Sequence, residues 1–289
     1  EQTIGRVCFD DDNLYISAEC VVNEIGKFKD RLDKADGKFD YSHGGVIEVF
    51  LDSDHDKKSF QQYLLHANGS SKISLPKDDI FRILNEDYLN CRSQITDKGF
   101  DIEMSFPLAM LHLDPETSRV WGFNLNRAHD LYDEHFDKNG FFSSWSSTKG
   151  QAFGSPEMFG ELSVDTDLSR FYWQIDFVRE PKPGDTEVKV RIKNETGRKF
   201  SGKLTFSLAG LSNSDTEYKK KISIAADQET IVSFEHPFSV EDMQAKYELV
   251  LTDDRGKICY LGGTQKVDKT QGDSWPVSTP TWSWQSPRL

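Results

Sequence analysis

Three aspartates alternate in one short run of the sequence, Asp52-Ser53-Asp54-His55-Asp56. Alternate residues of a tight loop project to one side, and carboxylate oxygens are the ligands that calcium prefers. The run departs from the EF-hand pattern, because Lys57 stands in place of the loop glycine and Tyr63 in place of the final glutamate. We expect either calcium at Asp52, Asp54 and Asp56 or an acidic turn between two strands. A second, weaker acidic loop holds Asp130, Asp133, Glu134, His135 and Asp137.

Trp145 lies between serines in the run Ser143-Ser144-Trp145-Ser146-Ser147. Sugar sites combine an open aromatic face with a few polar groups, and small polar neighbours favour an open indole. Trp145 is therefore a candidate sugar platform. Glu48 or Asp130 could accept hydrogen bonds from sugar hydroxyls and Arg127 could donate them, although Glu48 and Arg127 could equally pair inside the sheet.

The sequence holds no familiar catalytic motif. It has no GxSxG, HExxH, GxGxxG or P-loop pattern, and its seven histidines are scattered. With 48 acidic residues, a pair of carboxylates suited to glycoside hydrolysis is not a specific signal. The four cysteines form no CxxC pair, so neither a zinc motif nor a redox motif is present, and we expect buried free thiols. The fragment is predicted not to be an enzyme.

The charge of the chain is concentrated in its first half. The net charge is −13, and residues 1–166 hold 30 acidic against 17 basic side chains, whereas residues 167–268 hold 17 and 16. This balance argues against nucleic-acid partners, which need clustered lysine and arginine. It suits neutral polyols, cations or basic partners. No apolar run approaches the roughly 18 residues of a membrane-spanning helix.

Alternating apolar residues predict an all-β protein. In the first half we expect a hairpin over Thr3–Val22, with Cys8 beside Tyr15, and a loop with one helical turn over 23–45. Val46–Leu51 reads as a strand buried on both faces. Pro107–Leu111 reads as a short helix. The other expected strands are Phe60–Ala67, Lys72–Leu75, Ile80–Leu84, Leu89–Thr96, Phe100–Phe106, Val120–Arg127, which opens with Trp121 in the core, and Met158–Val164.

A second pattern begins after Asp165. Seven short strands with Gly and Pro turns predict an immunoglobulin-like sandwich without the Cys…Trp…Cys signature. They are Phe171–Val178, Glu187–Asn194, Lys203–Leu208, Tyr218–Ile224, Thr230–Phe234, Tyr247–Thr252 and Lys257–Leu261. The expected domains are thus 1–165 and 166–268. Residues 269–289, rich in Pro and Trp, are expected to be a linker into a further domain of the same polypeptide.

Several segments of the first half occur in an order that resembles the carbohydrate-binding module family 9-like domains. The segments are Asp12–Ile16, Val46–Asp52, Gly99–Pro107, Trp121–Arg127, Ser144–Ser146 and Phe159–Leu162. The resemblance implies a jelly-roll-like β-sandwich that binds a glycan or oligosaccharide, often beside glycoside hydrolase modules and often with structural calcium. It also implies an extracellular or periplasmic location, although no signal peptide is present in the sequence as given.

The leading expectation is a non-catalytic carbohydrate-binding module joined to a spacer domain, taken from a larger secreted glycan-processing protein. One alternative is a haem-binding electron-transfer domain of the related DOMON type, for which Met104, Met110 and Met158 supply candidate axial ligands. Another is a structural or adhesion fragment without a sugar site.

Overall fold

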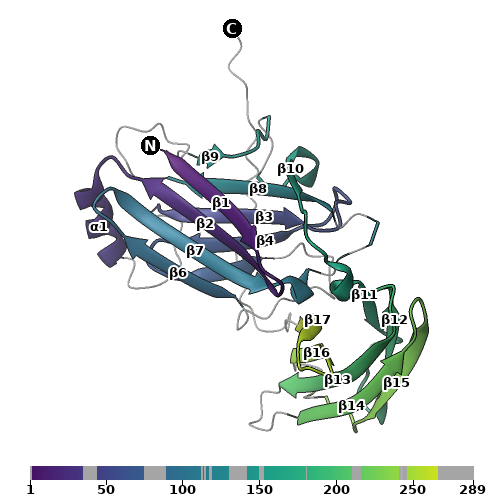
Figure 1. The fold of residues 1–289 in the computed structure, drawn as a ribbon. Helices are drawn as coiled ribbons and strands as arrows, with labels where there is room; N and C mark the ends of the chain where they lie inside the picture. Colours follow the sequence, from purple (N-terminus) through teal and green to yellow (C-terminus); the bar gives the residue numbers. More distant parts are fainter. Residues whose placement is uncertain are drawn as a thin grey trace, which may run out of the picture.

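The computed structural model describes residues 2–34, 44–74, 89–111, 113, 115–116, 119–129, 142–149, 153–179, 181–209, 216–240, 242 and 246–265. These residues form two β-rich lobes (Figure 1), and all the sheets are antiparallel. In the parts of the chain so described, no helix is long and apolar enough to cross a membrane. The predicted all-β class is confirmed.

The first lobe is a sandwich of two sheets. One has the strand order β1-β2-β7-β6, and the other has the order β10-β8-β3-β4-β5 with β9 also paired to β8. The strands of the first sheet are β1 Thr3–Phe9, β2 Asn13–Val21, β6 Asn90–Ile95 and β7 Gly99–Pro107. Those of the second are β3 Val46–Asp52, β4 Gln61–His66, β5 Ser71–Ser74, β8 Val120–Ala128, β9 Phe142–Ser144 and β10 Gly160–Ser163.

The two sheets enclose a core built from one face of each strand. Trp121 is fully buried there, as its alternating strand predicts, and Tyr63 stacks on Phe106 with ring centroids 4.6 Å apart. The predicted hairpin is also confirmed, with Cys8 opposite Tyr15. Strand β3 is buried along its whole length, so its second face is covered as well. The expected strand Ile80–Leu84 lies outside the described residues.

A ten-residue helix, α1 (Ile25–Lys34), occupies a segment where the sequence predicts only one helical turn. Ile25, Phe28 and Leu32 follow one another at helical spacing, and Phe28 stacks on Phe100 with centroids 5.4 Å apart. The helix buries only a narrow stripe and its other residues are polar. The helical period of its apolar residues is therefore not apparent from the sequence. The predicted helix at Pro107–Leu111 is instead a 3-10 turn, η3 (Leu108–Met110).

The second lobe is a seven-stranded, immunoglobulin-like sandwich with its own hydrophobic core. All seven predicted strands are present, and β12 has the predicted bounds. Three strands form one sheet in the order β11-β12-β15: β11 Trp173–Phe177, β12 Glu187–Asn194 and β15 Glu229–Glu235. Four form the other, in the order β14-β13-β16-β17: β13 Phe200–Ala209, β14 Thr216–Ile224, β16 Lys246–Asp253 and β17 Ile258–Gln265.

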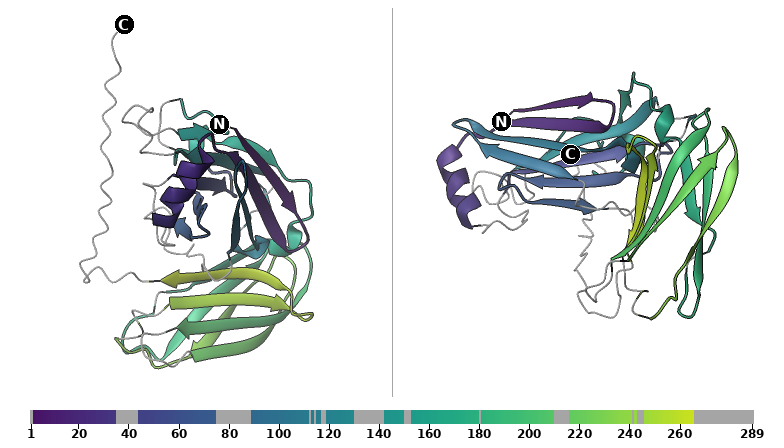
Figure 2. Two further views of the ribbon diagram at one scale, coloured as in Figure 1. Left: turned by 90° about the vertical axis from the view of Figure 1, so that its left-hand side faces the viewer. Right: turned by 60° about the horizontal axis from the view of Figure 1, so that its bottom comes forward.

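The lobes meet at a packed junction, and their strands run in clearly different directions (Figure 2). Leu261 of β17 is buried in the core of the first lobe, where β17 packs against η3. The turn between β1 and β2 adds polar contacts, because Asp12 accepts from Arg170 and from Lys257, the latter at 3.4 Å. Both apolar burial and ion pairs therefore stabilise the interface between the two lobes.

Candidate functional site

A group of buried and half-buried polar side chains lies on the outer face of the second sheet, which is the rear layer in Figure 1. Cross-strand partners share a face, and Glu48 of β3 lies opposite Asn126 of β8, which lies opposite Ser144 of β9. Gln62 and Asn124 belong to the same face, next to these residues. Glu48 is 5% exposed and both asparagines are fully buried. We call Glu48, Gln62, Asn124, Asn126 and Ser144 the polar cluster.

Two hydrogen-bonded sets fix most of this cluster. Gln62 Nε2 donates to Glu48 Oε2 at 2.9 Å. Asn124 Oδ1 accepts from Ser144 Oγ at 3.1 Å and from the Ser146 N–H at 2.9 Å, so Asn124 anchors the chain that follows β9. These side chains are consequently held in fixed orientations on the sheet.

Asn126 differs from its neighbours. Within the described residues, neither its amide nitrogen nor its amide oxygen has a hydrogen-bond partner, although the side chain is fully buried. An unsatisfied buried polar group costs about 1–3 kcal/mol, and proteins rarely retain one without a reason. The amide presents a donor and an acceptor beside the Glu48 carboxylate, which is the arrangement that a pair of neighbouring hydroxyls can satisfy.

An apolar surface borders the cluster at the end of β3. Phe50, Phe60 and Phe159 form a group whose ring centroids are 5.6–5.7 Å apart. Phe50 shares the outer face with Glu48, because the two residues are two positions apart on one strand. The face therefore combines a few directed polar groups with aromatic side chains, as small-molecule sites commonly do.

Residues 2–166 match the family model described as carbohydrate family 9 binding domain-like. The chain belongs to this family. Family 9 domains of this kind are binding modules, so the first lobe is not a catalytic domain.

Two solved structures are similar to this chain. They are family 9 carbohydrate binding modules from Caldicellulosiruptor kristjanssonii, one in complex with glucose and one with cellotriose. Each is 17% identical to this chain and covers 58% of it, with 80% and 78% of their own chains matched and TM-scores of 0.40 and 0.39. No curated protein matches the chain.

The structure of this family 9-like domain separates two of the predicted site residues. Arg127 lies opposite Ile47 and faces the core, so it leaves β8 on the face opposite to Glu48 and Asn126. Its Nη1 donates to Thr3 Oγ1 at 3.3 Å, and its guanidinium lies 5.3 Å from the centre of the Phe100 ring. The pairing of Glu48 with Arg127 that the sequence allowed is therefore wrong, since adjacent strand positions alternate between faces.

Trp145 is 59% exposed, so it is not a core residue. Its ring lies against Phe123 at 5.7 Å between centroids, and a Cβ added to Gly160 would come within 2.3 Å of the indole. Phe123 and Gly160 are cross-strand partners on the core-facing side of the sheet. Trp145 therefore lies at the sheet edge, away from the polar cluster. Asp130 and the second acidic loop fall outside the described residues.

The aspartate loop after β3 brings three carboxylates together. One oxygen from each of Asp52, Asp54 and Asp56 lies within 4.8 Å of the others. Burial, followed by the hydrogen bond and the charge of Asp54, raises the pKa of Asp52 to about 7. Asp52 also accepts the N–H groups of Asp56 and Lys57, at 3.2 and 3.0 Å. The donor set fits a hard cation, and the same bonds fit a turn closed by its first aspartate.

Calcium binding at this loop stays a prediction. We expect calcium at a hundredfold excess over its dissociation constant to stabilise the protein by about 2.7 kcal/mol, and chelator to reverse this. The measurement is the melting temperature with calcium, with magnesium and with chelator. Asp54→Asn should abolish the response to calcium while raising the melting temperature in chelator, because it relieves carboxylate repulsion. An identical melt in calcium and chelator would leave an acidic turn without a metal.

Sequence reasoning found Glu48 but missed Asn126 and Gln62. The signal for Asn126 was present in Trp121-Gly122-Phe123-Asn124-Leu125-Asn126-Arg127, where asparagines alternate with core residues. Polar residues that alternate with core residues normally indicate that the second face of the strand is exposed to solvent. Here β8 is buried on both faces, so they indicate a covered polar site.

Proposed function

We propose that this chain is a carbohydrate-binding module with an immunoglobulin-like spacer, and that the polar cluster is its sugar site. The observation that carries the proposal is the buried Asn126 amide, unsatisfied among the described residues and in register with Glu48. A pyranose offers neighbouring hydroxyls that can donate to the Glu48 carboxylate and both donate to and accept from the amide. The carboxylate disfavours anionic sugars, so a neutral sugar is the proposed ligand.

Asn126→Leu tests the proposal because leucine has a similar volume and no polar atoms. We expect affinity for the best-binding sugar to fall at least tenfold, which corresponds to about 1.4 kcal/mol. The melting temperature should stay the same or rise, because the variant removes an unsatisfied buried group. Calorimetric titration with neutral mono- and oligosaccharides, including glucose and cellotriose, measures the first quantity, and thermal denaturation measures the second.

Two variants serve as controls. Asn124→Leu should lower the melting temperature, because the Ser146 N–H and the Ser144 hydroxyl then lose their acceptor. Trp145→Ala should leave affinity within about twofold, since the indole is on the other side of the sheet. Unchanged binding in Asn126→Leu together with a tenfold loss in Trp145→Ala would refute the polar cluster and move the site to the sheet edge.

The wider setting is part of the same proposal and rests on the family relationship. We propose domain limits at 1–165 and 166–268, with 269–289 leading into a further domain of a larger secreted glycan-processing protein that acts in the extracellular or periplasmic space. The gene sequence that flanks this segment tests it, because a glycoside hydrolase domain there would support the setting. Of the alternative haem ligands, Met104 and Met110 are buried in the hydrophobic core of the first lobe.

A further inference from the structure

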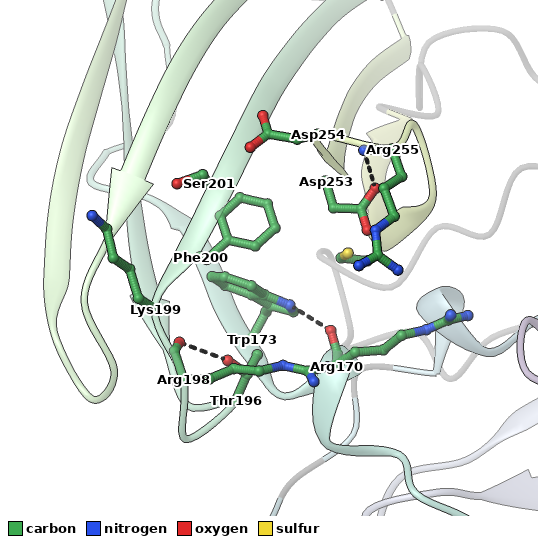
Figure 3. Close-up of a pocket in the computed structure, with 11 residues that line it drawn as sticks. Arg170, Trp173, Thr196, Arg198, Lys199, Phe200, Ser201, Asp253, Asp254 and Arg255 are labelled. Carbon is green, nitrogen blue, oxygen red and sulfur yellow. Dashed lines mark hydrogen bonds between the residues drawn. The ribbon is translucent and has the colours of Figure 1, made fainter.

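A pocket lies in the second lobe, far along the chain from the polar cluster. It has a volume of about 480 Å³, within the roughly 300–1,000 Å³ of small-molecule sites. Its walls come from the 3-10 turn Ser169–Phe171, the turn between β12 and β13 and the turn between β16 and β17 (Figure 3). We call it the turn pocket.

The floor of the turn pocket is apolar and fixed. Trp173 and Phe200 meet edge to face with centroids 4.7 Å apart. The indole Nε1 donates to the Arg170 carbonyl at 2.8 Å, so this N–H is already satisfied. The buried Cys259 forms part of the wall. This lining suits a ligand with a body of several carbon atoms better than a bare inorganic ion.

The charges around the pocket are unbalanced. Four cationic side chains and two carboxylates line it, although the whole chain has a net charge of −13. Arg170 is paired with Asp12. Asp253 Oδ1 accepts the N–H groups of Arg255 and Lys257, both at 2.9 Å. Among the described residues, the side chains of Arg198, Lys199 and Arg255 have no ion-pair partner.

Two of these cations approach the cavity from different turns. Figure 3 shows the Arg198 side chain extending inward from the β12–β13 turn and the Arg255 side chain extending down from the β16–β17 turn. The pKa of Cys259 reflects this field: burial and the charge of Asp253 raise it to about 11, while Arg170 and Arg198 act in the opposite direction. Positive charge therefore reaches the pocket wall.

We propose that the turn pocket binds a small organic carboxylate of about sugar size, with Arg198 and Arg255 holding the carboxylate. Guanidinium groups bind carboxylates through paired, charge-assisted hydrogen bonds. The apolar floor contacts the body of the ligand. Because Arg170 is already paired with Asp12, three cations and two carboxylates remain in the lining, and this net excess of one positive charge suits a singly charged ligand rather than a polyphosphate.

The test uses D-glucuronate as the probe and glucose as its neutral match, titrated at low ionic strength into the full chain. Arg198→Gln and Arg255→Gln should each weaken glucuronate binding at least tenfold, with unchanged melting temperatures because both side chains are exposed. Arg191→Gln is the matched control, because Arg191 is an exposed cation elsewhere in the same lobe, paired with Glu229 at 3.3 Å. It should leave binding unchanged.

Two further arms separate this pocket from the polar cluster and from simple anion binding. Glucuronate binding should persist in Asn126→Leu, and sulfate should bind at least tenfold more weakly than glucuronate. Glucuronate affinity that is unchanged in both arginine variants, or lost in Asn126→Leu, would overturn the proposal. Equal binding of sulfate would overturn the assignment of an organic carboxylate.

Discussion

Replacing Gly99 with alanine should lower the free energy of unfolding by more than about 4 kcal/mol. Losses of this size are exceptional, and the cause here is a steric clash with backbone atoms. Gly99 begins β7 and lies opposite Val21 of β2. A Cβ at this position would lie 1.8 Å from the Cys20 carbonyl oxygen and 3.0 Å from the Val22 nitrogen. Both are backbone atoms of the paired strand, so a rotamer change cannot relieve the contact. The pairing of β2 with β7, the two central strands of the first sheet, would have to open at this end.

Urea unfolding followed by tryptophan fluorescence measures this effect, since the buried Trp121 reports on the same lobe. Gly26→Ala is the control, because Gly26 lies in α1 and a Cβ there would meet nothing within 4 Å. Alanine should stabilise the helix by about 0.5–1 kcal/mol. A Gly99→Ala protein that unfolds within about 1 kcal/mol of wild type would show that the two strands separate more easily than this packing implies.

Asn194→Ala should destabilise the second lobe by about 3–5 kcal/mol. Asn194 is fully buried at the end of β12. Its Nδ2 donates to the carbonyls of Arg198, Ala225 and Ile224 at 2.8, 3.0 and 3.2 Å. Its Oδ1 accepts the Thr196 N–H at 3.1 Å and the Thr196 hydroxyl at 2.7 Å. One side chain thus ties together the ends of strands from both sheets.

Alanine leaves several of these buried backbone groups without partners, and this loss is larger than the loss of the bonds alone. Ser201→Ala is the control. The exposed Ser201 hydroxyl lies 3.4 Å from Ser223 Oγ, and its loss should change stability by less than about 0.5 kcal/mol. Thermal unfolding monitored at the second lobe distinguishes the two variants. Equal melting temperatures would show that water replaces the amide at little cost.

The fold could be predicted from the sequence where burial follows a simple period. Alternation located β12 at its observed bounds and the β6–β7 hairpin around Gly99. Helix α1 was missed because only Ile25, Phe28 and Leu32 mark its buried side. Such a narrow stripe reads as a polar loop when the packing partner, Phe100, is about 70 residues away in the sequence.

The candidate site was less predictable because it depends on which face of a strand each residue occupies and on what covers that face. Glu48 and Arg127 both suit sugar binding by chemical type, yet the register of β3 and β8 directs them to opposite faces. Trp145 is open, as its serine neighbours indicate, but it lies over Gly160 at the sheet edge. Asn126 became visible as a site residue only once its burial and its unsatisfied amide were known.

The junction at Asp12 and Leu261 has a mechanical consequence. Strand β17 is shared between the cores of the two lobes, because it pairs within the second sandwich and places Leu261 inside the first. A ligand bound at the proposed sugar site would therefore also orient the second lobe, because the lobes can rotate little relative to each other without exposing Leu261. The two lobes therefore move as one rigid unit and do not reorient independently of each other. The end of β17 is therefore held at a fixed distance and direction from the sandwich of the first lobe.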